Sequence, residues 1–228
     1  MNKDKDMQIS LELGHETSLC ESDFIVSSAN ELAFEHIAAF PNWPHHFMLI
    51  IGKEKSGKSH LAKIWQEKSN AIFVKNDMLE MLAKQGGTQP IIIEDIDRAG
   101  FDEEKLFHLL NQSLRDGRAV LMSAQSEISE WEFSTNDVLS RARLATSFFV
   151  SAPDDAQLAQ MFAKLFADRQ VSVAPNIISY LISRMQRSAS EVVALVDLMD
   201  QLAMSRNKPI SRKIASEALE LRMRADDE

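Results

Sequence analysis

The chain has 228 residues, of which 45% are hydrophobic and 26% charged, as is typical of a soluble globular protein with one α/β core and a small second domain. A formal net charge of −9, without any run of Lys and Arg, argues against direct nucleic-acid binding and favours a protein partner. The longest apolar run, 47–51, is too short for a bilayer, the first residues lack the apolar stretch of a secretory signal, and the single cysteine, Cys20, excludes an internal disulfide. We therefore expect a cytoplasmic protein with no membrane partner.

The first part of the chain, residues 1–22, is predicted to be a flexible polar tail. Its one patterned stretch is Gln8-Ile9-Ser10-Leu11-Glu12-Leu13. A tail with alternate apolar anchors suits a peptide ligand, although an unremarkable tail or an edge strand fits the same pattern. The next predicted element is a helix over 31–40, which ends before Pro41 because proline disfavours helix in the residue ahead.

Short apolar runs then alternate with amphipathic segments. The runs lack period-2 alternation, as expected of strands buried on both faces. This alternation predicts an α/β fold with a five-stranded parallel sheet and helices on both faces. The predicted strands are 47–51, 71–74, 91–93, 119–122 and 147–150, and the predicted helices are 58–68, 77–84 and 102–115.

After Pro153 the strand pattern stops. Asp154 or Asp155 can cap a helix there, and further amphipathic helices are predicted at 176–185, 190–204 and 211–223. The change of period near residue 153 is the one credible domain boundary. We expect an α/β domain over 23–152 and a small all-helical domain over 153–228.

The strongest motif is a phosphate-binding loop, Gly52-Lys53-Glu54-Lys55-Ser56-Gly57-Lys58-Ser59, between a predicted strand and a predicted helix. Its glycines let the loop wrap a phosphate with the backbone N–H groups pointing inward, and the helix N-terminus adds partial positive charge. Lys58 would reach the β- and γ-phosphates, and the Ser59 hydroxyl would bind Mg²⁺. A chance match arises in roughly 1% of chains of this length, so the motif predicts nucleotide binding.

A second signal is the acidic run Glu94-Asp95-Ile96-Asp97 after the apolar run 91–93. Carboxylates at the end of a buried strand lie beside the phosphate loop in doubly wound sheets. Glu94 follows Lys58 by 36 residues, the distance at which such proteins carry their metal carboxylate. We expect Glu94 to hold Mg²⁺ and Asp95 to polarise an attacking water; an ordinary solvated turn is the alternative.

These motifs, together with Asp23-Phe24-Ile25-Val26 and Asn30-Glu31-Leu32-Ala33, resemble the AAA+ domain of the DnaA family of replication initiators. Within that family the resemblance is greatest to the short Hda-type regulators, in particular their alphaproteobacterial, HdaA-like form, and it covers about residues 23–225. It implies ADP or ATP bound between the α/β domain and a helical lid. The residues implied are Ile25 or Val26 beside the base, Pro153 at the hinge, and Gly52, Lys55, Ser56, Gly57, Lys58 and Ser59 around the phosphates.

The resemblance also implies two catalytic elements. Ser123 in Leu121-Met122-Ser123-Ala124 matches the polar sensor that ends the fourth strand, although a serine that satisfies a turn fits equally well. The segment 137–143 resembles the arginine-finger box and places the finger at Arg141, with Arg143 as the alternative. A guanidinium supplied across a subunit interface can stabilise charge on a neighbour's γ-phosphoryl group, whereas a solvated arginine has no such role.

The sequence departs from the family pattern at three places. Glu94 stands where the family usually has Asp, and Glu191 stands where the lid should carry a second sensor arginine. Arg187, one turn earlier, is the candidate substitute. The helix-turn-helix domain of DnaA has no counterpart here, so we expect no direct sequence-specific DNA binding.

The resemblance implies a nucleotide-bound regulator that, with the DNA polymerase sliding clamp, stimulates ATP hydrolysis by DnaA. Gln8, Leu11 and Leu13 would bind the clamp, and the protein's own ATPase activity would be weak or dependent on a partner. Nucleotide-dependent self-association is a further expectation. A stand-alone AAA+ ATPase such as a helicase loader and a nucleotide-locked clamp adaptor without chemistry remain as alternatives.

Overall fold

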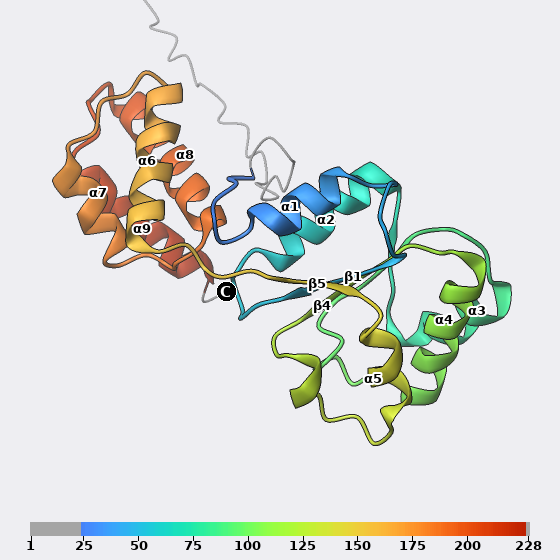
Figure 1. Cartoon of the computed structure of the whole chain (residues 1–228). Helices are drawn as coiled ribbons and strands as arrows, with labels where there is room; N and C mark the ends of the chain where they lie inside the picture. The colour runs from blue at the N-terminus through green and yellow to red at the C-terminus, as the bar shows by residue number, and fades with distance from the viewer. Residues whose placement is uncertain (1–23, 227–228) are drawn as a thin grey trace, which may run out of the picture.

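The computed structural model describes residues 24–226 and contains a five-stranded parallel sheet in that range (Figure 1). The spatial order of the strands is β2-β3-β4-β1-β5, and every neighbouring pair is parallel. This confirms the predicted α/β fold class. The strands are β1 (Phe47–Ile51), β2 (Ile72–Phe73), β3 (Ile91–Ile93), β4 (Val120–Ala124) and β5 (Thr146–Phe149).

Helices cover both faces of this sheet (Figure 1). On one face lie α1 (Glu31–Ala38) and α2 (Lys58–Ser69); on the other lie α3 (Leu79–Gln85), α4 (Glu103–Asp116) and α5 (Asn136–Ala142). Residues of β1 alternate between the two hydrophobic clusters, with Phe47, Leu49 and Ile51 in one and Met48 and Ile50 in the other. Both faces of β1 are therefore buried, which explains why its sequence is uniformly apolar.

The chain after β5 folds into α6 (Asp155–Asp168), α7 (Pro175–Ile182), α8 (Ala189–Arg206) and α9 (Arg212–Asp226), which we call the lid. These helices share a hydrophobic cluster of their own. Of the two predicted caps, Asp154 caps α6, through a reciprocal capping box with Gln157. In the described part of the chain, no helix combines the length and the apolar character needed to cross a membrane.

Several predicted boundaries shift. The first helix ends at Ala38 instead of residue 40, the second strand shrinks to Ile72–Phe73, and the helix predicted at 77–84 begins as a 3-10 turn, η2 (Asn76–Met78). A second 3-10 turn, η3 (Ile128–Glu130), follows β4. The most consequential shift concerns β4, which continues to Ala124 because β1 pairs with it as far as Ile51. Ser123 therefore lies within the strand, one residue before its end.

Candidate nucleotide-binding site

The predicted phosphate-binding loop connects β1 to α2, and its backbone is sharply turned. Lys55 and Gly57 have positive φ values of 62° and 98°. A Cβ atom on Gly52 would lie 2.3 Å from the carbonyl oxygen of Val150, so only glycine fits where the loop leaves the sheet. The hydroxyl of Ser56 is buried and has no hydrogen-bond partner among the described residues. The loop thus combines tight curvature with a buried hydroxyl that has no partner among the described residues, which fits an anion-binding turn.

Lys58, the first residue of α2, is buried, with 7% of its surface exposed. Its Nζ donates to the carbonyl oxygens of Gly52 (2.6 Å) and Lys53 (3.1 Å), so the ammonium lies against the loop. Burial lowers the pKa of Lys58, and the negative charges of Asp95 and Asp97 oppose that shift. The lysine and the acidic strand end are therefore close enough to interact electrostatically.

The acidic end of β3 is joined to β4 by Ser123. The Ser123 hydroxyl accepts a hydrogen bond from the backbone N–H of Asp95 (3.0 Å). The backbone carbonyl oxygen of Ser123 accepts one from the backbone N–H of Ile96 (2.9 Å). Asp95 itself has a φ of 44°, a left-handed conformation uncommon for a residue with a side chain. The structure thus brings together Asp95 and Ser123, which the sequence placed on separate strands.

Asp97 has a structural role that the sequence reasoning missed. Its Oδ2 accepts from the backbone N–H groups of Gln125 (2.9 Å) and Ser126 (3.0 Å) and from the Ser126 hydroxyl (2.9 Å). These bonds hold the loop that follows β4 against the end of β3. The acidic run in the sequence draws attention to Asp97. It does not reveal the partners of Asp97, because they lie 28 and 29 residues away in the chain.

The donors expected for Mg²⁺ are chemically suitable. Ser59 is exposed in the first turn of α2, and one carboxylate oxygen of Glu94 is buried without a hydrogen-bond partner among the described residues. Hard oxygen donors of this kind are what Mg²⁺ prefers, and it typically takes one or two carboxylates together with substrate phosphates. Within residues 24–226, no group of three or more His, Cys, Asp and Glu side chains forms a metal site. Ser59 and Glu94 thus fit a metal that phosphates help to hold.

A cavity of about 310 Å³ lies between the phosphate loop and the lid, within the size range of small-molecule sites. Of the predicted residues, Ile25, Lys55, Ser56, Gly57 and Pro153 line it. The cavity therefore joins an apolar end to the tip of the phosphate loop. Four predicted loop and base residues do not line it, namely Val26, Gly52, Lys58 and Ser59. A larger hollow, of about 710 Å³, lies over α3 and α4 and includes none of the predicted phosphate-loop residues.

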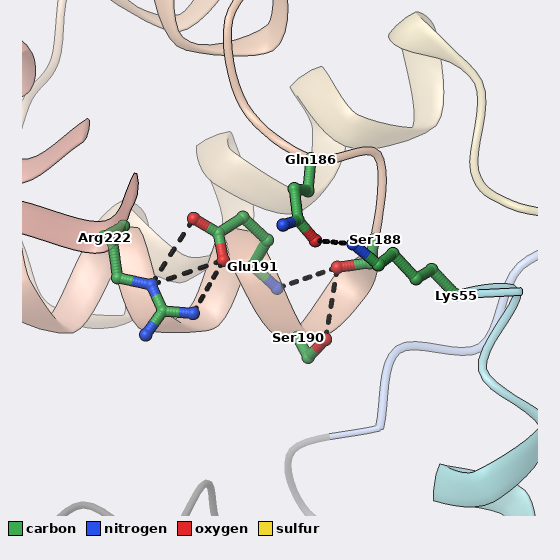
Figure 2. Close-up of polar contacts among 6 residues, drawn as sticks. All are labelled: Lys55, Gln186, Ser188, Ser190, Glu191 and Arg222. Atoms are coloured by element: carbon green, nitrogen blue, oxygen red, sulfur yellow. Dashed lines mark hydrogen bonds and ion pairs between the residues drawn. The ribbon is translucent and has the colours of Figure 1, made fainter. Parts of the chain in front are cut away.

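Several lid residues that line this cavity are polar, and Figure 2 shows the contacts that they make. The Nζ of Lys55 donates to Oε1 of Gln186 (2.6 Å) and so bridges the phosphate loop and the lid. Ser188 caps α8 by accepting from the backbone N–H of Glu191 (3.1 Å). The Glu191 carboxylate in turn pairs with the guanidinium of Arg222 on α9, with Nη2 to Oε2 at 2.8 Å.

Arg187, the expected substitute for the second sensor arginine, does not line the cavity. Its guanidinium pairs with Asp155 at 2.5 Å, and both side chains are more than half exposed. The lid arginine that lines the cavity is Arg222, so this geometry does not support the substitution suggested by the sequence. The sequence reasoning missed Arg222 because α9 carries it, far along the chain from the start of α8.

Arg141 lies at the end of α5, on the sheet face opposite to α1 and α2 (Figure 1). Its Nε donates to Oδ1 of Asn111 (2.5 Å), and its guanidinium lies 5.5 Å from the ring centroid of Phe107. Both contacts come from α4. Arg141 does not line the cavity, and Arg143 is exposed. The predicted finger is thus held by contacts with α4 and does not line the candidate cavity of the same chain.

The sheet, the loop between β1 and α2, and the helical lid together have the fold of an AAA+ domain. Replication initiators and RuvB of Thermotoga maritima are among the solved proteins that share it. Domain III of DnaA from Thermotoga maritima matches with a TM-score of 0.68 and 13% identity, covering 89% of this chain and 95% of that domain. AMPPCP-bound DnaA from Aquifex aeolicus matches with a TM-score of 0.66 and 16% identity, covering 95% of this chain and 71% of that one.

In sequence, the chain is 23% identical over 225 aligned residues to the chromosomal replication initiator protein DnaA of Zymomonas mobilis. The match covers 86% of this chain but only 46% of the initiator, so the chain spans about half the length of that relative. No protein-family model matches the chain. In fold and in sequence, the chain is therefore similar to DnaA over the part that it covers.

Proposed function

We propose that this protein binds an adenine nucleotide and, together with the DNA polymerase sliding clamp, stimulates ATP hydrolysis by DnaA. The observation that carries the proposal is the position of Arg141 within a DnaA-like AAA+ fold. Arg141 is held by Asn111 and does not line the candidate nucleotide cavity of the same chain, so it suits an interaction with the nucleotide of a partner protein.

Nucleotide binding rests on the phosphate loop and the adjoining cavity. Ser56, Gly57 and Lys58 would hold the phosphates, and the apolar end beside Ile25 and Pro153 would take the base. Ser59 and Glu94 would hold Mg²⁺, which when bound would neutralise phosphate charge. The nucleotide would be ADP or ATP; two DnaA structures of similar fold contain the ATP analogue AMPPCP.

Arg141 would act on the ATP of DnaA after the two proteins dock. An arginine finger stabilises the charge that develops on the transferred phosphoryl group and accounts for about 10³–10⁵ in rate in characterised systems. Asn111 and Phe107 restrict the guanidinium before docking, so less conformational entropy is lost on binding.

The clamp interaction rests on the sequence alone, because Gln8, Leu11 and Leu13 lie outside the described residues. Alternate apolar side chains on an extended peptide suit pockets on a partner surface. We propose that this peptide binds the sliding clamp and brings Arg141 near DnaA.

The experiment is to add the purified protein and DNA-loaded clamp to ATP-bound DnaA and to measure ADP production. Arg141→Ala should abolish the stimulation, while Arg143→Ala, two residues away, serves as the matched control. If Arg141→Ala stimulates like the wild type, Arg141 is not the finger; loss in Arg143→Ala alone would move the finger to Arg143.

The same assay separates the alternatives. A stand-alone ATPase would hydrolyse ATP without DnaA, with stimulation by nucleic acid and loss in Lys58→Ala. A clamp adaptor without chemistry would lose function in Gln8→Ala and retain it in Arg141→Ala. Either pattern would replace the proposed function.

A further inference from the structure

The lid of this acidic protein carries basic side chains that no carboxylate compensates. Two stretches of the sequence, 169–190 and 201–216, contain seven Arg and Lys residues and no Asp or Glu, although acidic residues outnumber basic ones by 34 to 25 in the whole chain. Three of the seven pair with carboxylates from other segments, namely Arg169 with Asp197, Arg187 with Asp155 and Arg206 with Glu217. The other four are exposed and form no ion pair among the described residues; they are Arg184, Lys208, Arg212 and Lys213.

The packing of α7 on α9 brings two of these four to the same tyrosine. The guanidinium carbon of Arg184, in the turn after α7, lies 4.3 Å from the ring centroid of Tyr180. That of Arg212, the first residue of α9, lies 4.7 Å from the same centroid. The Tyr180 hydroxyl donates to Oγ of Ser216 on α9 (3.3 Å), which fixes the ring between the two helices. We call Tyr180, Arg184 and Arg212 the lid patch.

The two guanidinium groups retain most of their hydrogen-bonding capacity. Arg184 donates through Nη1 alone, to Oγ of Ser183 (2.7 Å) and to the carbonyl oxygen of Tyr180 (3.4 Å). Arg212 makes no side-chain hydrogen bond among the described residues. A guanidinium carries five N–H donors in a fork that matches phosphate oxygens, and contact with an aromatic ring restricts it before a ligand arrives. The lid patch is therefore a preorganised site for anionic oxygen.

The spacing of the charges favours nucleic acid as the anion. Because both guanidinium carbons lie close to one ring centroid, they are no more than about 9 Å apart. Duplex DNA carries one negative charge per about 1.7 Å of its axis, so roughly five phosphates fall within that distance. Both arginines can thus meet a phosphate at any register along the duplex.

The surroundings of the lid patch disfavour other anionic partners. No large hydrophobic side chain of α7 or of residues 207–216 is exposed. Protein interfaces have an apolar core depleted in charge, and helices that lie on membranes insert apolar side chains. Arg and Lys with few apolar neighbours are instead the donors that contact the nucleic-acid backbone.

We propose that the lid patch binds the sugar-phosphate backbone of nucleic acid without reading its sequence. Phosphate contacts position a protein but carry no sequence information. Lys208 and Lys213, which flank Arg212 in the chain, add positive charge. None of these residues lines the candidate nucleotide cavity, so the inference goes beyond the proposed function and does not depend on it.

The test titrates the full chain into a fluorescein-labelled DNA duplex of about 20 base pairs and follows fluorescence anisotropy at several salt concentrations. Arg184→Gln and Arg212→Gln should each weaken binding about 15-fold at about 50 mM salt and about fourfold at about 200 mM, because one phosphate contact releases about 0.9 counterion. Each should reduce the slope of log affinity against log salt by about 0.9. Both side chains are exposed, so these variants should fold.

Matched variants separate the lid patch from net charge and from folding. Arg143→Gln removes the same charge from an exposed position in the α/β domain and should leave the affinity unchanged. Tyr180→Phe keeps the ring and should bind like the wild type. Tyr180→Leu removes the ring but keeps both charges, so binding should weaken while the salt slope stays the same.

Several results would overturn the inference. The first is a double variant, Arg184→Gln with Arg212→Gln, that keeps the wild-type affinity and slope, and the second is an equal loss in Arg143→Gln. Tighter binding of a poly-glutamate peptide of equal charge would make the partner an acidic protein, and tighter binding of anionic lipid vesicles would make it a membrane. A strong preference between two unrelated duplex sequences would exclude a backbone contact. Each of these outcomes leaves the proposed function standing, because adenine-nucleotide binding and stimulation of DnaA are measured separately.

Discussion

Gly52→Ala should destabilise the protein through one close approach between the phosphate loop and the end of β5. The added Cβ would lie 2.3 Å from the carbonyl oxygen of Val150, 2.6 Å from Oγ of Ser56 and 2.8 Å from Cγ2 of Val150. The Ser56 hydroxyl can rotate, but the carbonyl belongs to a backbone that is fixed. Val150 donates its N–H to Ile51 (2.8 Å), and Gly52 donates to Ala124 (3.0 Å).

The expected cost follows from these contacts. Overpacking a tight site costs about 1–3 kcal/mol, and a strained or lost hydrogen bond adds about 0.5–1.5 kcal/mol. The free energy of unfolding should therefore fall by roughly 2–4 kcal/mol. For a chain of this size, each kcal/mol lowers the melting temperature by about 2–4 °C, so a fall of roughly 5–15 °C is expected.

The assay is thermal unfolding followed by circular dichroism without nucleotide. Gly100→Ala is the control, because an added Cβ there would meet nothing within 4 Å; unlike Gly52, Gly100 has a positive φ, 63°. In that variant the free energy of unfolding should fall only by the cost of placing alanine in a left-handed conformation, about 1–2 kcal/mol. A melting temperature for Gly52→Ala equal to or above that of Gly100→Ala would refute the argument from close approach.

Three further predictions concern the site and its surroundings. Lys58→Met removes a buried ammonium and should weaken Mg-ADP binding about 10- to 150-fold by calorimetry, since a charged hydrogen bond contributes about 1.5–3 kcal/mol; a change below threefold would contradict this. Asn111→Ala releases Arg141 and should lower stimulation of DnaA several-fold at unchanged ADP affinity, and an unchanged rate would show that the tether is dispensable. Burial lowers the pKa of His36, so its stabilising contribution is present above its unfolded pKa of about 6.5 and is lost as the pH falls. Between pH 7 and pH 5 the wild type should lose more thermal stability than His36→Phe, and equal losses would exclude this residue as the cause.

The sequence predicted the elements whose signals are local. The uniformly apolar run 47–51 indicates a strand buried on both faces, and the structure has β1 there with every residue buried. Asp154 before an amphipathic segment predicts a helix start, and the capping box confirms it. The residues around Gly57 and Lys58 predict a tight turn between a strand and a helix because glycine spacing and the flanking apolar pattern are read along the chain.

Other features could not be predicted because the residues involved are far apart in the chain. Whether Ser123 lies inside β4 or after its end depends on how far β4 pairs with β1. A short apolar pattern does not indicate where that pairing ends. The contact of Arg141 with Asn111 depends on how α5 packs on α4. The lid arginine was sought at Arg187, near the start of α8, although α9 brings Arg222 to the cavity.

By itself, the sequence determined the fold class, the turn between β1 and α2 and the resemblance to the DnaA family, because each depends on residue type at short spacing. Only the tertiary structure decided which side chains meet at the cavity and which charge lies opposite which. Periodicity specifies the face that an element buries, but the order of the strands and the packing of the helices select its neighbours. The contact between Glu191 and Arg222 is a product of that packing, since α8 and α9 must pack together before these two side chains can meet.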